Sequence, residues 1–175
     1  MLDTSGSIQV SNAVSHSRVN ACGFFVNQKR QMASGQEQRV LLHSLTIAVR
    51  WGDMDALGHV NSAAYFVYME QARVHWLASV GVEDIGTGAN VGAVIANAHC
   101  TFHRSIAYPA ELEVQMHGGA PGRSSFESYY YLRDADDNAV LYATGSARIV
   151  WVDYTNERSL PLPEFIRRQL PTPDR

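Results

Sequence analysis

The spacing of hydrophobic and polar positions changes near residue 40. Residues 1–39 are rich in Ser, Asn, Gln and Gly and show no sustained periodicity apart from a short apolar run at 23–26, a composition typical of disordered chain. Residues 40–51 combine β-branched and aliphatic side chains in partial alternation, which predicts a strand. We therefore predict a disordered leader over 1–39 and one folded domain over 40–175.

Residues 61–79 have the apolar spacing of an amphipathic helix. Five side chains at intervals of three, four, seven and eleven residues share one helix face, which we expect in the core or at a subunit interface: Tyr65, Tyr68, Met69, Ala72 and Trp76. Asn61 and Ser62 are suited to cap the start of this helix, and Gly81 stands where a cap at its end belongs.

The remaining chain reads as four extended segments, at 91–104, 110–118, 124–134 and 139–152, separated by turn-forming Gly, Pro, Asp and Asn residues. A short closing helix is expected near 163–170. The predicted order is a strand, one long helix and then four strands. One helix of about five turns can cover one face of an antiparallel sheet, so the predicted fold class is α+β.

Composition and charge narrow the possible partners. The chain has 175 residues, of which 46% are hydrophobic, and 14 basic against 17 acidic residues give a net charge of -3. This balance offers no electrostatic footprint for nucleic acid or an anionic membrane. No run approaches the roughly 18 apolar residues of a spanning helix. We therefore expect a cytoplasmic protein without nucleic-acid or membrane partners.

Cysteine and histidine give no sign of a metal or a disulfide framework. The two cysteines, Cys22 and Cys100, are far apart and belong to no CxxC motif. The seven histidines are scattered, and neither HxxxH nor HExxH occurs. We expect reduced thiols, no metal site and no cofactor.

The connection between the first strand and the long helix is the densest group of candidate functional residues. It carries Asp53, Asp55 and His59 within seven residues, and Gly58 permits an unusual backbone angle or a close ligand approach. A helix start leaves backbone N–H groups unpaired and partly positive, so it can polarise a carbonyl that a nearby carboxylate attacks. The pattern equally allows both aspartates to be turn formers and His59 to satisfy the loop.

A longer motif extends this group. Residues 50–73 match the pattern R-W-x-D-x-D-x-x-G-H-V-N-x-x-x-Y-x-x-Y-x-E-x-A-R. This passage resembles the signature of the hotdog-fold acyl-CoA thioesterases of the 4-hydroxybenzoyl-CoA thioesterase type. The resemblance extends over about 40–152 and implies a hotdog fold, in which a curved antiparallel sheet of about five strands wraps around one long helix. The leader lies outside it.

The resemblance also implies an activity and a site. It implies hydrolysis of an acyl-CoA to a free acid and CoA without a cofactor, by a homodimer or homotetramer. Asp55 matches the catalytic carboxylate, acting as nucleophile or general base, and His59 would orient Asp55, the water or the carbonyl. Ser62 matches the helix-start residue whose N–H faces the thioester oxygen, with Gly58 and Asn61 beside it in the substrate-binding passage.

Two other functions stay open from the sequence. One is an acyl-carrier-protein thioesterase, and the other is a non-catalytic module that binds acyl thioesters. Glu70 and Arg73 stand three residues apart on the predicted helix and are interpreted as a structural pair. Four arginines are available to meet the phosphates of coenzyme A, and no spacing selects among them: Arg104, Arg123, Arg133 and Arg148.

Overall fold

A computed structural model describes residues 38–82 and 90–172. The predicted disordered leader falls almost wholly on residues 1–37, which lie outside the described residues. Within the described residues the elements follow one another along the chain as β1 (Val40–Ala48), η1 (Trp51–Asp53), α1 (Ser62–Ser79), β2 (Val91–Phe102), β3 (Glu111–Gly118), β4 (Ser125–Asp134), β5 (Leu141–Asp153), β6 (Arg158–Ser159) and α2 (Glu164–Arg167).

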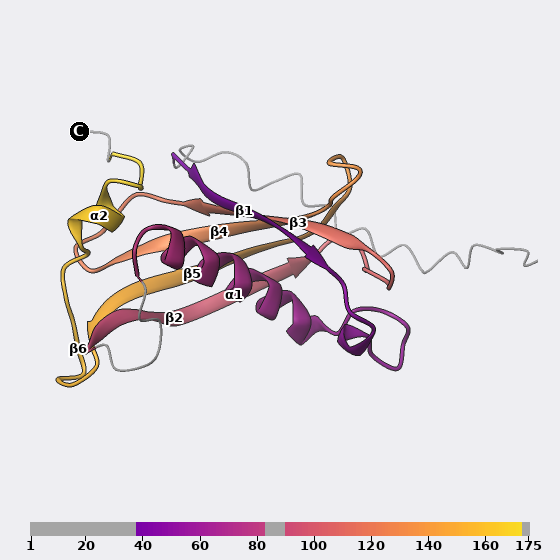
Figure 1. The fold of residues 1–175 in the computed structure, drawn as a ribbon, viewed down its shortest axis with the longest axis horizontal. Coiled ribbons are helices and arrows are strands. Elements are labelled where there is room, and N and C mark those ends of the chain that lie inside the picture. Colours follow the sequence, from indigo (N-terminus) through magenta and orange to yellow (C-terminus); the bar gives the residue numbers. More distant parts are fainter. Residues whose placement is uncertain (1–37, 83–89, 173–175) are drawn as a thin grey trace, which may run out of the picture. The chain divides into compact units, whose positions relative to one another are not determined.

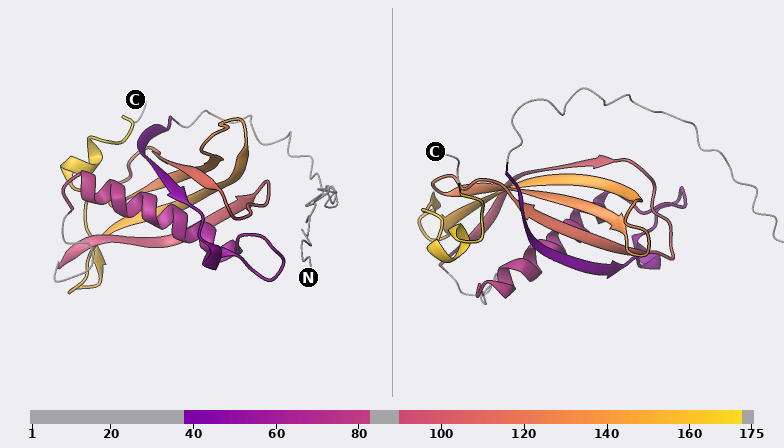
Figure 2. Two further views of the ribbon diagram at one scale, coloured as in Figure 1. Left: turned by 45° about the vertical axis from the view of Figure 1, so that its right-hand side comes forward. Right: turned by 90° about the horizontal axis from the view of Figure 1, so that it is seen from above.

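The strands form one antiparallel sheet in the order β1-β3-β4-β5-β2, and the short β6 pairs with β5. The sheet is curved, and α1 lies along one of its faces (Figures 1 and 2). This arrangement confirms the predicted α+β fold, a curved antiparallel sheet around one long helix. In the sheet order β1 and β2 are the two outermost of the five long strands.

The core lies between α1 and the sheet face that it covers. On β3, Leu112, Val114 and Met116 alternate with more exposed residues and are fully buried. The predicted helix face is buried against them, including Tyr68 and Trp76. Complete burial of one such side chain stabilises the fold by about 1.5–3 kcal/mol, so this interface holds the helix in place.

Two of the three predicted caps, Asn61 and Gly81, are confirmed at the ends of α1. The Asn61 side chain accepts a hydrogen bond from the N–H of Ala63, and Gly81 follows the C-cap residue Val80 with a φ of 89°, which is in the left-handed region. Ser62 is the first helical residue rather than a cap. The start of α1 is thereby fixed to within one residue of the prediction.

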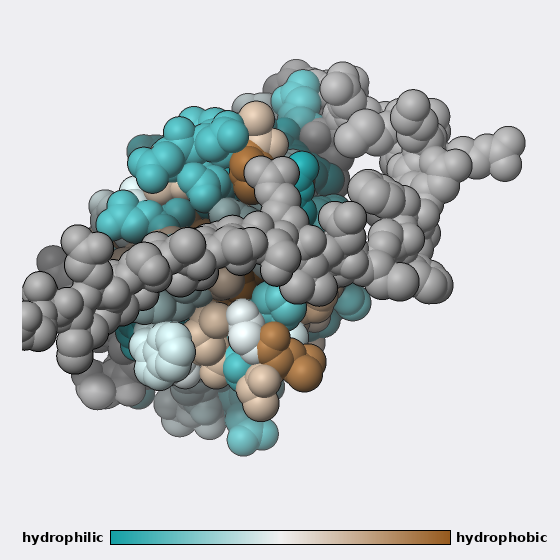
Figure 3. Space-filling model, turned by 90° about the vertical axis from the view of Figure 1, so that its right-hand side faces the viewer, coloured by the Kyte–Doolittle hydropathy of each residue, from teal (hydrophilic) through white to brown (hydrophobic). Residues whose placement is uncertain are grey.

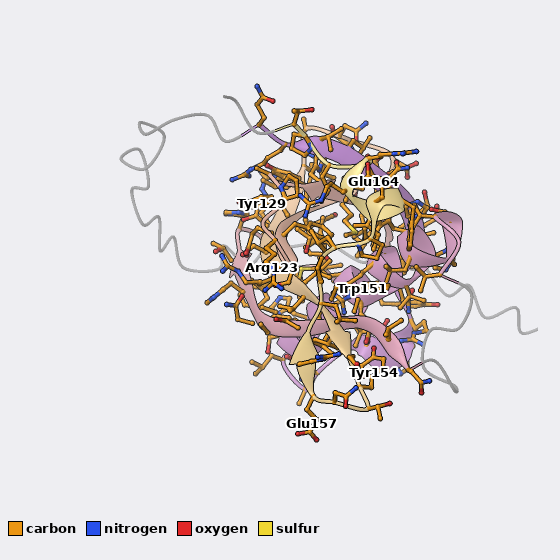
Figure 4. The ribbon with its side chains drawn as sticks, turned by 90° about the vertical axis from the view of Figure 1, so that its left-hand side faces the viewer. Arg123, Tyr129, Trp151, Tyr154, Glu157 and Glu164 are labelled. Carbon is orange, nitrogen blue, oxygen red and sulfur yellow. The ribbon has the colours of Figure 1, made fainter. Side chains whose placement is uncertain are left out.

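The C-terminal segment closes the end of the sheet opposite the η1–α1 connection (Figures 1 and 4). Residues Leu162, Ile166 and Leu170 are buried there, which accounts for the predicted closing helix, although α2 is only one turn long. The aromatic ring of Phe165 packs edge-on against Trp151, with 6.3 Å between the ring centroids. Figure 4 shows Trp151 and α2 at this end of the domain.

Gly145 of β5 is packed directly beneath α1. A Cβ atom at this position would overlap the Met69 sulfur and lie 3.1 Å from the carbonyl oxygen of His99. We expect Gly145→Ala to lower the free energy of unfolding by about 1–3 kcal/mol, measured by urea denaturation. Gly52→Ala is the matched control, because nothing lies within 4 Å of its added Cβ. Equal stability of the two variants would contradict this packing.

Candidate active site

The chain from the last residue of η1 to the start of α1 forms a narrow loop, residues 53–61, here called the η1–α1 loop. At its base the N–H of Asn61 donates to the carbonyl oxygen of Asp53 at 2.8 Å. One step further in, the N–H of Asp55 donates to the carbonyl oxygen of His59, also at 2.8 Å. Gly58 closes the tip with a φ of 79°, which confirms the expected unusual backbone angle.

Asp53 is the buried acid of the pair, with 9% of its surface exposed. Its carboxylate accepts hydrogen bonds from Arg50 N at 3.0 Å, from Arg50 Nη2 at 3.0 Å and from the Tyr68 hydroxyl at 2.9 Å. Burial alone would raise the pKa of Asp53, but the hydrogen bonds from Arg50 and Tyr68 outweigh it and hold the pKa below its usual value. Asp53 is therefore a charged structural residue with its oxygens occupied.

Asp55 is more open. Its Oδ1 atom accepts from the N–H of Leu57 at 2.8 Å and lies 3.5 Å from the backbone nitrogen of His59. Within the described residues its Oδ2 atom has no hydrogen-bond partner. The backbone thus orients this carboxylate through one oxygen and leaves the other for a ligand or water, so the two aspartates have different environments.

A surface pocket of about 330 Å³ brings the candidate residues together. One wall comes from the η1–α1 loop and the start of α1, and the other from the end of β2 and the residues after it: Asp55, His59, Val60, Ser62, Tyr65, Phe102, His103, Arg104 and Ser105. Gly58 and Asn61 flank the pocket in the chain without lining it. The pocket therefore contains the predicted carboxylate, histidine and helix-start residue.

The backbone N–H groups at the start of α1 differ in whether they have an acceptor. The N–H of Ala63 donates to Asn61 Oδ1, and the N–H of Ala64 donates to the Asn61 carbonyl oxygen, each at 2.9 Å. Among the described residues the N–H of Ser62 has no such acceptor. An unpaired N–H at a helix start is a suitable donor to a carbonyl oxygen or a developing oxyanion.

The imidazole of His59 makes no hydrogen bond within the described part of the chain. The backbone of this residue, rather than its ring, contacts Asp55. The ring is exposed at the pocket wall, where it can meet a ligand or water. Its predicted role in orienting Asp55, water or the carbonyl therefore stays a prediction.

Of the second wall of the pocket, sequence reasoning named only Arg104 as a candidate binding residue. His103, Arg104 and Ser105 follow directly after β2, and His103 Nε2 lies 3.0 Å from the hydroxyl oxygen of Thr144. A polar run directly after a strand was the available signal. Arg104 is the one of the four candidate arginines that lines this pocket.

The other arginines have different surroundings. Arg133 donates to the carbonyl oxygen of Asn138 at 2.8 Å, and Arg148 forms an ion pair with Glu127 at 3.2 Å. Arg123 lies at the α2 end of the domain (Figure 4). On α1, the predicted pair of Glu70 and Arg73 is present as a loose contact of 3.9 Å between the charged atoms.

Apolar side chains are exposed beside the η1–α1 loop. Trp51 is 73% exposed and packs edge-on against the ring of Tyr108, with 5.6 Å between centroids, and Leu57 at the loop tip is 81% exposed. Figure 3 shows apolar and polar side chains intermixed on this end of the domain.

Cys100 is the one cysteine among the described residues. Burial raises the pKa of the Cys100 thiol to about 11, so it is protonated and a poor nucleophile at neutral pH. Across residues 38–82 and 90–172, no three His, Cys, Asp or Glu side chains are grouped so that they could hold a metal ion. In the same ranges no helix is long and apolar enough to cross a membrane.

Known proteins resemble this chain in sequence and structure. The PA2801 protein of Pseudomonas aeruginosa, a candidate thioesterase, is 38% identical, with a TM-score of 0.70 over 74% of this chain and 98% of that one. A candidate acyl-CoA thioesterase of Xanthomonas campestris, XC229, is 35% identical, with a TM-score of 0.59 over 65% of this chain and 95% of that one.

The curated protein YsmA of Bacillus subtilis is 25% identical over 84 residues, which are 48% of this chain. The match spans 56% of YsmA, or about half the length of that relative. The family model of the thioesterase-like superfamily matches residues 49–170, which include the η1–α1 loop, α1 and the whole described sheet after β1. Together with the hotdog architecture shared with PA2801, this match shows that the chain belongs to the thioesterase-like superfamily.

Proposed function

We propose that the protein hydrolyses an acyl-CoA thioester to a free carboxylic acid and CoA, in the manner of the 4-hydroxybenzoyl-CoA thioesterase type. One observation carries the proposal: the open carboxylate oxygen of Asp55 and the unused N–H of Ser62 belong to residues that line the same pocket. Membership of the superfamily and the likeness to a candidate acyl-CoA thioesterase support the same reaction class.

In this mechanism the thioester carbonyl lies over the start of α1, and its oxygen accepts a hydrogen bond from the N–H of Ser62. The Asp55 carboxylate either attacks the carbonyl carbon, giving an acyl anhydride that water then opens, or removes a proton from an attacking water. In both routes the C–S bond breaks and CoA leaves as a thiolate. A thiol of ordinary pKa near 8.5 leaves without strong acid assistance, so no separate general acid is needed.

A thiol-release assay tests this function. The purified protein is offered short, long and aromatic acyl-CoAs and the matching acyl-carrier-protein thioesters, and free thiol is followed with a chromogenic thiol reagent. Turnover of acyl-CoAs supports the proposal. Turnover restricted to carrier-protein substrates would favour the acyl-carrier-protein alternative. Binding of acyl thioesters without any hydrolysis would favour the non-catalytic module.

We further propose that the protein is a homodimer joined through β2. This strand is 12 residues long, and its outer edge has no partner among the described strands. Exposed apolar side chains lie on it and on α1, including Val94, Ile95, Phe66 and Val67. A long apolar edge strand is a template for pairing with another chain, and an antiparallel pairing with a second β2 would continue the sheet.

Ile95→Asp tests this interface. Ile95 is 37% exposed and lines a groove between β2 and α1, so a charge there would be buried by a partner at a cost that weakens association. We expect the variant to elute as a monomer when its mass is measured by light scattering. Thr46→Asp on β1, at the opposite edge of the sheet, is the control and should keep the wild-type mass. Unchanged mass in the Ile95 variant would contradict an interface at β2.

A further inference from the structure

We propose that Asp53 is a positioning residue, which fixes the η1–α1 loop so that Asp55 and the Ser62 N–H act on the same carbonyl. The inference rests on the proposed function, because it assigns Asp53 a part in the hydrolysis carried out by Asp55. Asp53 itself does not touch the substrate in this account. It is buried, and both of its carboxylate oxygens accept hydrogen bonds from the protein.

The contacts of Asp53 join three parts of the structure. Its carbonyl oxygen accepts from the N–H of Asn61, which closes the base of the loop. Its carboxylate accepts from the backbone and side chain of Arg50, which fixes the chain entering η1. The same carboxylate accepts from the hydroxyl of Tyr68, which lies 15 residues further on in α1. One side chain therefore ties the loop to the helix.

Met54 lies between Asp53 and Asp55 in the chain, and two contacts restrain its position. It forms an isolated β-bridge with Val60, and its sulfur accepts from the backbone N–H of Tyr108 at 3.4 Å. The chain thus has little freedom between the buried acid and the open one. A rotation at Asp53 would be transmitted to Asp55 through a single restrained residue.

In the proposed mechanism two groups of the protein must contact the same thioester carbonyl. The Ser62 N–H belongs to the first residue of α1, whereas Asp55 belongs to the loop. The hydrogen bond from Tyr68 to Asp53 connects the loop to that same helix, so both reacting positions are held relative to α1. Displacement of a reacting group by about 1 Å is enough to lower a rate about 100-fold. The contacts of Asp53 with Arg50 and Tyr68, here called the Asp53 clamp, therefore act on the rate rather than on substrate binding.

Two variants test the clamp in the full-length protein. Asp53→Asn removes the charge and one acceptor, and Tyr68→Phe removes the bond to the helix while leaving Arg50 in place. We expect both to lower kcat for acyl-CoA, by about 10- to 100-fold for Asp53→Asn and less for Tyr68→Phe, with KM changed less than about twofold. If Asp53→Asn does not fold, as judged by circular dichroism, the Tyr68 variant carries the test.

A double-mutant comparison separates positioning from general destabilisation. In the Asp55→Asn background, Asp53→Asn should lower the residual rate no further, because there is no carboxylate left to position. Asp134→Asn is the matched control: Asp134 accepts from a tyrosine hydroxyl, that of Tyr142 at 2.7 Å, and from nearby backbone N–H groups, but outside the η1–α1 loop. Its kcat should equal that of the wild type.

Each outcome decides between the two proposals. Wild-type kcat in both clamp variants would overturn the positioning role while leaving the proposed hydrolysis intact. An equal fold loss of kcat from Asp53→Asn in the wild-type and the Asp55→Asn backgrounds would also overturn the positioning role. Wild-type activity of Asp55→Asn would instead overturn the proposed mechanism, and the positioning role with it.

Discussion

Asp55→Asn is expected to abolish nearly all turnover, lowering kcat by about 100- to 10,000-fold, while the protein keeps its fold. An amide is neither a nucleophile for a thioester nor a base for water. The asparagine oxygen can still accept from the N–H of Leu57, which Asp55 Oδ1 does at 2.8 Å, so the loop tip should keep its conformation. Thiol release from acyl-CoA measures the rate, and circular dichroism with thermal unfolding verifies the fold.

Asp137→Asn is the matched control for this loss. Asp137 accepts from the backbone N–H two residues on, that of Ala139 at 3.0 Å, as Asp55 does from Leu57, but it lies in the β4–β5 turn. The same chemical change should therefore leave kcat unaltered there. A rate near that of the wild type in Asp55→Asn would remove Asp55 from the mechanism.

The long helix was predictable because local features of its own sequence indicate both its buried face and its two ends. The apolar spacing from Tyr65 to Trp76 requires one buried face, and these side chains are buried. Asn61 and Gly81 have side-chain and backbone properties that act locally at the two helix ends. The patterns of the later strands are similarly local, which is why their bounds differ from the predicted ones by no more than two residues at any end.

Two other elements differ from the prediction, because their formation depends on backbone contacts rather than on a side-chain pattern. The first strand was expected to reach residue 51 but ends at Ala48, and the chain then turns into η1, where Asp53 binds the N–H of Arg50. The two-residue β6 was not predicted, since Arg158 and Ser159 carry no alternation and pair with β5 through the backbone. Pairings of this kind leave no pattern in the side chains.

At the candidate site, too, some features were predictable from the local sequence and others were not. The local sequence pattern placed an Asp-x-Asp pair before a helix start and left both aspartates open as turn formers, and only the family resemblance singled out Asp55. Their difference arises because Tyr68, on the helix, reaches Asp53 and not Asp55. The second wall, from His103 to Ser105, joins the pocket only when the end of β2 lies beside the start of α1. These relations come from the packing of the helix on the sheet.

The role assigned to the start of α1 depends on one backbone N–H, which an ordinary side-chain substitution cannot remove. Ser62→Pro removes it. Proline is well tolerated at the first position of a helix, and the ψ of 139° at Asn61 lies in the range preferred before proline. We expect kcat for acyl-CoA to fall by about 100- to 1,000-fold, as on the loss of an oxyanion donor, with the helix content unchanged by circular dichroism.

Ser62→Ala is the necessary comparison, because it removes the hydroxyl but keeps the N–H. Its kcat should stay close to that of the wild type if the backbone group is the donor to the thioester oxygen. Equal losses in the two variants would assign the role to the hydroxyl instead. Full activity in Ser62→Pro would mean that the carbonyl is not polarised by this N–H. Since Asn61 already occupies the N–H groups of Ala63 and Ala64, the donor would then have to come from outside the first turn of α1.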